Sequence, residues 1–250
     1  MNSLLAAIRF LTIIPVPGNR GTDQKHLAPS LFWFPVVGTL IGGVLGGIFV
    51  FLTALIPLQQ ITALLAVLAL LSASGGLHLD GVADCADGFF SSRPRARILE
   101  IMKDSRIGAM GVIALVFVIL LKAAAFNSLP AGYLWKAVVL MPITGRCAIL
   151  IMMALLPYAR PEGGLGSLFY KKSNRFYAVW GLAFMFGAGW LVAAKQGLVI
   201  SAAALILALA FSWYCKRKIG GATGDTLGAV CELTETVTAI AFAAISIFEF

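Results

Sequence analysis

The chain has 250 residues and a formal net charge of +8, and 60% of its residues are hydrophobic whereas only 12% are charged. An ordinary soluble domain is about one quarter charged, so this composition excludes a typical water-soluble fold. Several apolar runs also reach the roughly 20 residues that a helix needs to cross a bilayer. We therefore predict an all-α, polytopic membrane protein with a single integral membrane domain over residues 1–250.

Residues 1–29 are predicted to form an N-terminal interfacial segment, because Arg9 interrupts their apolar run and Pro15 and Pro17 follow it. A cleaved signal peptide is not expected, since no small-residue cleavage site follows. Residues 30–250 are predicted to form a transmembrane bundle of about seven spans, connected by cytoplasmic catalytic loops. The spans lie near residues 30–55, 60–79, 107–127, 135–157, 176–194, 197–215 and 227–248.

The first predicted span, FPVVGTLIGGVLGGIF, contains five glycines at spacings that place several of them on one helix face. Small residues four positions apart let two helices approach closely in lipid. We expect this stripe to serve helix packing. Its members are Gly38, Gly42, Gly43, Gly46 and Gly47.

The basic residues concentrate in alternate connections, which is the pattern expected of cytoplasmic loops. With the N-terminus in the cytoplasm, 15 of the 19 Lys and Arg residues fall on that side. The positive charge therefore reports membrane topology, and a nucleic-acid partner is not expected. These residues are Arg9, Arg20, Lys25, Arg93, Arg95, Arg97, Lys103, Arg106, Arg160, Lys171, Lys172, Arg175, Lys216, Arg217 and Lys218.

The connection after the second span, GGLHLDGVADCADG, contains three aspartates at positions i, i+4 and i+7. On a helix Asp80, Asp84 and Asp87 share one narrow stripe, where three like charges repel. A divalent cation would offset that repulsion, because Mg²⁺ takes one or two carboxylates together with water and phosphate oxygens. The alternative is a helix end with solvated carboxylates. Three aspartates on one stripe beside His78 favour the metal site. His78 could act there as ligand, base or phosphate donor.

The segment KDSRIG follows the aspartates and adds Asp104, flanked by Lys103 and Arg106. Arg suits bidentate phosphate recognition and Lys supplies a point charge. We expect Asp104 to complete the acidic cluster as a metal ligand, and the two cations to contact phosphate.

A second polar cluster, GGATGDTLGAVCELTE, occupies residues 220–235. Its glycine-rich start, which includes Gly224, could present backbone amides to an anion at a helix entry. Asp225, Glu232 and Glu235 then share roughly one helix face. A loop and cap would explain the start of this segment, but not two acids that continue into an apolar span, which are functional hypotheses by default.

Two arginines complete the candidate site. Arg146 lies within the span near residues 135–157, where an ion pair with Glu232 or Glu235 and a direct substrate contact both fit. Arg160 stands in YARPEGGLG, a flexible glycine run that is by itself a weak indication of phosphate binding. Together the residues predict metal-assisted phosphoryl chemistry at the cytoplasmic face.

The motifs HLDGVADCADG, KDSRIGAMG, YARPEGGLG and GATGDTLGAVCELTE closely resemble those of the cobalamin synthase family, the adenosylcobinamide-GDP ribazoletransferases. The opening RFLTIIPVP and the FPVVG entry to the first span are also similar. The resemblance runs from the first ten residues to about Glu235.

The resemblance implies a multi-pass enzyme of the bacterial inner membrane that acts late in vitamin B12 assembly. It would join adenosylcobinamide-GDP to α-ribazole, or to its 5′-phosphate, and release GMP, with Mg²⁺ as cofactor and its active site on the cytoplasmic face. For the acceptor side we expect Asp225, Glu232 and Glu235 to position α-ribazole, with one of these carboxylates or His78 taking the hydroxyl proton. Lipid is an expected partner, and the oligomeric state is left open.

Three other classes of membrane protein share some of these features. A non-catalytic assembly scaffold is one, but it would have no need of aligned carboxylates. A CDP-alcohol phosphotransferase also displaces a nucleoside monophosphate with Asp-rich helices, but Asp84 stands where that signature has Arg, and the later spacings do not match. A secondary transporter usually places its charged groups near the midplane in two repeats. Here the acids gather at one face and no repeat is visible.

Overall fold

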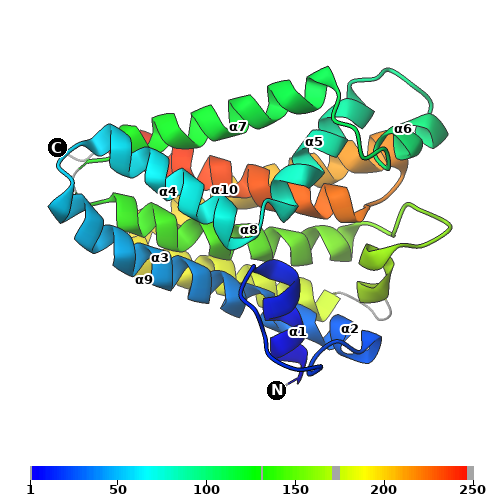
Figure 1. Ribbon diagram of the computed structural model, residues 1–250, viewed down its shortest axis with the longest axis horizontal. Helices are drawn as coiled ribbons and strands as arrows, with labels where there is room; N and C mark the ends of the chain where they lie inside the picture. The colour runs from blue at the N-terminus through cyan, green and yellow to red at the C-terminus, as the bar shows by residue number, and fades with distance from the viewer. Residues whose placement is uncertain (1, 131, 171–174, 247–250) are drawn as a thin grey trace.

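The computed structural model describes residues 2–130, 132–170 and 175–246, and throughout these residues the regular elements are helices. This arrangement confirms the predicted all-α fold (Figure 1). Three short 3₁₀ turns, η1 (Gln24–His26), η2 (Leu31–Trp33) and η3 (Leu165–Phe169), occur between the helices. The helices are α1 (Asn2–Leu11), α2 (Leu27–Ser30), α3 (Phe34–Leu55), α4 (Gln59–Ala73), α5 (Leu77–Phe89), α6 (Arg95–Ile101), α7 (Ala109–Asn127), α8 (Leu134–Leu155), α9 (Arg175–Ile219) and α10 (Gly224–Ser246).

Helix α8 is the centre of the bundle and packs against α3, α9 and α10. It is apolar on nearly every side and buried along almost its whole length, as expected of a helix surrounded by others. The glycine stripe of α3 lies on it: a Cβ atom at Gly38 would clash with the backbone of Pro142, and one at Gly42 with that of Val139. Close helix packing therefore explains Gly38, Gly42 and Gly46, as the sequence predicts, but not Gly43 and Gly47, which are exposed and meet no neighbour.

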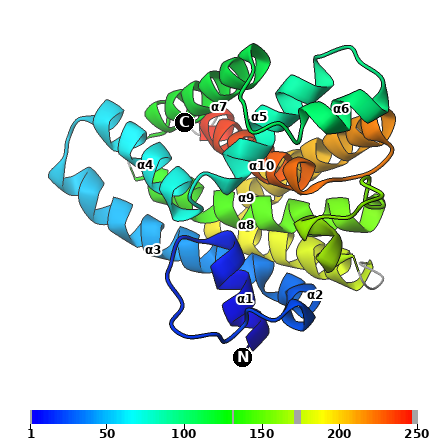
Figure 2. The same cartoon turned by 45° about the vertical axis from the view of Figure 1, so that its right-hand side comes forward.

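Helices α4 and α5 meet at an angle of 90°. Gly75 and Gly76 form the corner, and both have positive φ angles, 61° and 75°, which glycine adopts without steric cost. The predicted span 60–79 is therefore wrong at its end, because the helix stops at Ala73 and His78 belongs to the next helix. The bend lays α5 against the start of α10 and brings its aspartates to one end of the bundle (Figures 1 and 2).

Helix α9 is a hairpin of two helical arms that reverses at Ala193 and Ala194. Ala194 has a φ angle of 46°, and the hydroxyl of Ser201 donates a hydrogen bond of 3.1 Å to the carbonyl of Met185. Residues 16 positions apart meet in this way only if the chain turns back. The reversal occupies the last two residues of the predicted span 176–194, directly before the predicted connection to the span 197–215.

In the described part of the chain, five helical segments are long and apolar enough to cross a membrane, and the bent pair α4 and α5 would make a sixth. The connections that carry most of the basic residues gather at the end of the bundle that holds α6, whereas the turns after α3 and α7 lie at the opposite end (Figure 1). The number of spans and the cytoplasmic N-terminus stay predictions. Lys171 and Lys172 lie outside the described residues.

Candidate functional site

The acidic residues of α5 differ sharply in their surroundings, although they lie on one stripe. Within the described residues, the carboxylates of Asp80 and Asp84 form no hydrogen bond and no ion pair. Burial, together with the nearby carboxylates of Asp225 and Asp80, raises the pKa of Asp84 to about 7. These groups therefore form a crowded negative centre that lacks enough protein cations.

Asp87 instead holds the start of α7. Its two oxygens accept hydrogen bonds from the backbone amides of Gly108 and Gly111, at 2.7 and 2.8 Å. A Cβ atom at either glycine would come within 2.5 Å of the same carboxylate, so only glycine permits this approach. The carboxylate satisfies amides that the helix itself leaves unpaired and complements the positive end of its dipole. This arrangement gives Asp87 a structural role that the stripe of aspartates did not reveal.

The segment KDSRIG forms an exposed loop between α6 and α7. Asp104 accepts hydrogen bonds from the backbone amide and the guanidinium of Arg106, at 3.0 and 2.6 Å, and this pairing lowers the pKa of Asp104 to about 2. Lys103 pairs with Glu162 of the YARPEGG segment. The loop thus carries two exposed cations, each attached to a surface carboxylate from which a stronger anion could displace it.

The described residues contain no group of three or more His, Cys, Asp or Glu side chains close enough to hold a metal ion. The four predicted ligands, Asp80, Asp84, Asp87 and Asp104, are therefore not gathered around one point. A cation at Asp80 and Asp84 would complete its coordination with water and substrate oxygens, which is the usual manner for Mg²⁺.

Asp225 stands in the first turn of α10 and is paired with Arg160. The guanidinium donates to its carboxylate at 2.6 Å, and the hydroxyl of Thr223 donates at 3.2 Å. A short backbone bridge between Tyr158 and Ala222 holds the two segments together. A Cβ atom at Gly224 would meet no protein atom within 4 Å, so this glycine borders open space.

The other two acids of α10 lie within a buried network. Glu232 pairs with Lys122, and Glu235 pairs with both Lys122, at 3.1 Å, and Arg146. These four side chains are at most 5% exposed, and none of them lines the cavities described below. The geometry therefore favours the ion-pair alternative for Arg146 and gives Glu232 and Glu235 partners within the protein.

Lys122 was missed as a site residue, because the sequence placed it merely near a helix end. Its side chain is completely buried in α7. The indication was present, since a lone lysine in an apolar span requires a nearby partner.

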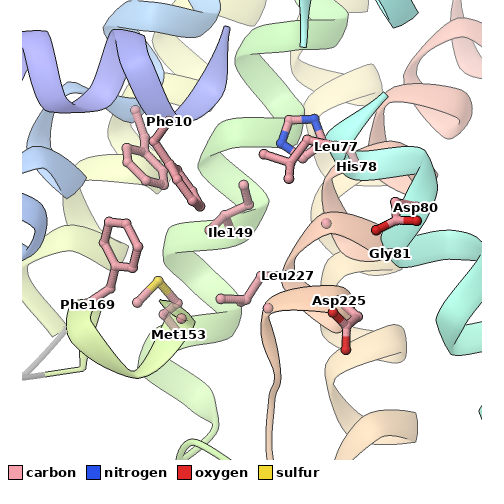
Figure 3. A pocket seen from close by; sticks show the side chains of 14 residues that line it. Phe10, Leu77, His78, Asp80, Gly81, Ile149, Met153, Phe169, Asp225 and Leu227 are labelled. Carbon is pink, nitrogen blue, oxygen red and sulfur yellow. The ribbon is translucent and has the colours of Figure 1, made fainter. Parts of the chain in front are cut away.

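Two cavities meet at α5. The first is an open polar cleft of about 830 Å³, which brings Asp80 and Asp84 together with Lys103, Asp104 and Arg106. The second is a smaller cavity of about 200 Å³ between α5, α8 and α10, whose wall includes His78, Asp80, Gly224 and Asp225 (Figure 3). Asp80 belongs to both walls.

Comparison with known proteins is consistent with this geometry. The sequence model of the cobalamin-5-phosphate synthase family matches residues 3–243. A protein of Acetivibrio thermocellus named adenosylcobinamide-GDP ribazoletransferase is 40% identical over 242 residues, which cover 97% of each chain. Proteins of the same name from Desulforamulus reducens and Clostridium acetobutylicum are 40% and 36% identical, over 94% and 93% of this chain and 93% and 92% of their own. No solved structure matches the chain significantly.

Proposed function

The chain belongs to the cobalamin-5-phosphate synthase family, and we propose that it joins adenosylcobinamide-GDP to α-ribazole or α-ribazole 5′-phosphate. A ribose hydroxyl of the acceptor forms the new bond to the phosphorus on the cobinamide side. The phosphoanhydride bond breaks, and GMP leaves with its bridging oxygen. The products are adenosylcobalamin, or its 5′-phosphate, and GMP.

The observation that supports this function best is the pair of unpartnered carboxylates, Asp80 and Asp84, in the wall of a polar cleft. Asp80, Asp84 and Asp225 carry three negative charges when ionised, and Arg160 supplies one positive charge near them. The remaining charge of −2 equals the charge that one divalent cation neutralises. Asp80 is exposed and Asp84 and Asp225 are partly buried, so their mutual repulsion, with oxygens still open to the cavities, is what makes this donor set fit Mg²⁺.

Asp80 and Asp84 would hold Mg²⁺ from the protein side, with the diphosphate and water supplying the other oxygens. When bound, the ion neutralises charge on the phosphoryl oxygens and favours departure of GMP. Asp87 keeps both oxygens on the start of α7, and it therefore acts in this proposal by positioning that helix beside the cleft.

Lys103 and Arg106 supply the positive charge of the opposite cleft wall. Both are exposed and flexible enough to exchange their surface carboxylates for a diphosphate, and the guanidinium can bind it bidentately. Arg160 remains close to the cleft through its bond to Asp225, and its Nε atom is buried without a partner among the described residues. That nitrogen is a further donor available to a phosphate oxygen after a small rotation.

The proton of the attacking hydroxyl passes to a carboxylate that can come within hydrogen-bond reach of it. Among the carboxylates expected for this role, Asp225 fits best, because it lines the smaller cavity whereas Glu232 and Glu235 are paired within the buried network. His78 lines only the smaller cavity and is 3% exposed, so it contacts the acceptor more readily than the diphosphate.

The site lies at the basic end of the bundle, and the positive-inside rule places that end in the cytoplasm. The proposal therefore includes a bacterial inner-membrane location, a lipid environment and a catalytic cleft that opens to the cytoplasm.

The function is tested by measuring GMP release from adenosylcobinamide-GDP and α-ribazole with purified protein in nanodiscs. We expect wild-type turnover to require Mg²⁺, and Asp80→Asn and Asp84→Asn to lower it by about 100-fold or more. Glu100→Gln is the matched control, because Glu100 is an exposed carboxylate of α6 that pairs with Arg97. Near-normal turnover in both aspartate variants would overturn the proposed site, and absence of GMP release from the wild type would overturn the function.

A further inference from the structure

Three phenyl rings from distant parts of the chain form one wall of the smaller cavity. Phe10 comes from α1, Phe34 from the start of α3 and Phe169 from η3. Their ring centroids are 5.0 to 6.1 Å apart, within the range of favourable aromatic contacts. Figure 3 shows Phe10 and Phe169 on the side of the cavity opposite Asp80 and Asp225. The cavity is therefore aromatic at one end and acidic at the other.

The other residues that line the smaller cavity also divide into an apolar and a polar group. Ile149 and Met153 of α8 supply an apolar floor, and Leu227 continues it on α10. Its ionisable groups are His78, Asp80 and Asp225, which lie on α5 and α10 (Figure 3). A ligand that matches these walls has a flat apolar body and a single polar end.

The size of the cavity limits which part of a substrate it can take. Its volume of about 200 Å³ is smaller than the 300–1,000 Å³ of pockets that enclose whole drug-sized ligands. A bicyclic aromatic base fits this space, whereas a corrin macrocycle does not. The polar cleft, at about 830 Å³, is the larger of the two spaces and carries the phosphate-binding cations.

The two spaces adjoin between α1 and α5, because Phe10, Leu77 and Asp80 line both of them. A nucleoside whose base lies against the phenyl rings directs its sugar toward Asp80, at the border of the cleft. Its hydroxyl then faces the place where the diphosphate lies. The order of chemical groups along the two cavities thus matches that of an acceptor nucleoside next to a diphosphate donor.

We propose that the cavity between Phe10, Phe34, Phe169 and the Asp80–Asp225 end binds the aromatic base of the acceptor nucleoside. For α-ribazole this base is dimethylbenzimidazole. The assignment rests on the proposed function and adds a specificity determinant to it: Gly224 lines the cavity, and its lack of a side chain leaves the space beside it open.

Gly224→Leu is the direct test. Gly224 lines the cavity and a Cβ there meets no protein atom within 4 Å, so a side chain can begin at this position without a backbone clash and narrow the cavity. We expect the variant to discriminate against the larger base: the ratio of the KM for α-ribazole to the KM for the unsubstituted benzimidazole riboside should rise about tenfold. One or two methyl groups in a filled pocket change selectivity by this amount. The KM for adenosylcobinamide-GDP should stay within about twofold.

Gly187→Leu is the matched control. Gly187 lies on α9, is exposed, and also has no protein atom within 4 Å of an added Cβ. The Gly187→Leu variant has the same added side chain, but outside the cavity. Its KM values for α-ribazole, the benzimidazole riboside and adenosylcobinamide-GDP should therefore equal those of the wild type.

Phe169→Ala provides a second test that does not depend on a bulkier side chain. It removes one aromatic wall and should weaken α-ribazole binding in nanodiscs, measured by calorimetry, about tenfold without weakening adenosylcobinamide-GDP. If both variants bind and use α-ribazole with unchanged selectivity, the base site is wrong, while GMP release by the wild type would still support the proposed function. If the wild type binds α-ribazole in a Phe169-dependent manner but releases no GMP, the proposed function fails and the base site stands.

Discussion

Two groups of charged side chains lie in this bundle, and they differ in how their charges are compensated. The buried network balances Glu232 and Glu235 with Lys122 and Arg146. Among the residues that the structure describes, Asp80 and Asp84 of the cleft have no ion-pair partner, and Asp225 of the adjoining cavity pairs with Arg160. Buried charge is tolerated only where partners are present, and the network supplies them from the protein. For the cleft we propose that a cation from outside compensates the charge.

Charge compensation distinguishes structural carboxylates from those proposed to act on substrate more reliably than residue type does. Both groups contain carboxylates and basic residues, and the sequence assigned both to one functional site. The balanced group holds α7, α8 and α10 together within the membrane region. The unbalanced group lies where two cavities meet, which is where substrates can reach it.

The largest expected effect follows from breaking the balance of the buried network. Lys122→Met leaves Glu232 without its partner, and loss of one member of a buried pair costs about 3–5 kcal/mol. We expect a large fall in thermal stability in detergent. The double variant Lys122→Met/Glu232→Gln restores charge balance and should recover most of that stability. Equal Tm values for wild type and Lys122→Met would show that the network is not structurally important.

A smaller loss of stability is expected from Asp87, which belongs to the acidic stripe but is satisfied by backbone amides. Asp87→Ala removes two charge-assisted hydrogen bonds from the start of α7 and should cost about 2 kcal/mol in unfolding free energy. Asp87→Asn retains one acceptor oxygen and should lose less. An Asp87→Ala variant with a normal Tm but no response to Mg²⁺ would instead place Asp87 among the metal ligands.

Arg106 tests the cationic wall of the cleft. Arg106→Ala should raise the KM for adenosylcobinamide-GDP about tenfold and leave the KM for α-ribazole unchanged, because the guanidinium contacts only the diphosphate. Arg97→Ala is the control, since Arg97 is an exposed residue that pairs with Glu100. A selective rise in the KM for α-ribazole would reverse the assignment of the two walls.

The smallest effect concerns the charge of Asp84 in the metal-free protein. Its pKa of about 7 lies above the value of 3.8 in an unfolded chain, so the folded protein disfavours the ionised form. The resulting loss of stability is complete above about pH 7 and absent below about pH 4. Asp84→Asn should therefore stabilise the metal-free protein at pH 8 by about 1 kcal/mol, a value reduced for solvent screening, and should have no effect near pH 4. Equal stabilisation at both values of pH would exclude charge crowding as the cause.

Much of the fold could be predicted, because hydropathy alone locates the long apolar helices and the glycine stripe of α3 indicates close packing. The corner at Gly75 and Gly76 was missed, since a short apolar run reads as the end of the span before it. The reversal of α9 was located correctly from the break in hydropathy around Lys195.

The candidate site could be predicted only where its residues are close in sequence. The charged side chains that line the cleft come mainly from two motifs, HLDGVADCADG and KDSRIG, and the sequence identified both. The partner of each acid depends on tertiary structure, so neither the pairing of Lys122 with Glu232 nor the contact of Asp87 with Gly108 could be derived. The phenyl wall was also missed, because its rings come from positions far apart in the sequence.

The central claim is that, in the described part of the chain, Asp80 and Asp84 of the cleft have no cation paired with them, whereas the acids of the buried network do. Mn²⁺ binding, measured by electron paramagnetic resonance with the protein in nanodiscs, tests it directly. The wild type and Lys122→Met/Glu232→Gln should bind Mn²⁺ with equal affinity, while Asp80→Asn/Asp84→Asn should bind it at least tenfold more weakly. Unchanged Mn²⁺ binding by the cleft variant, or its loss in the network variant, would contradict this account.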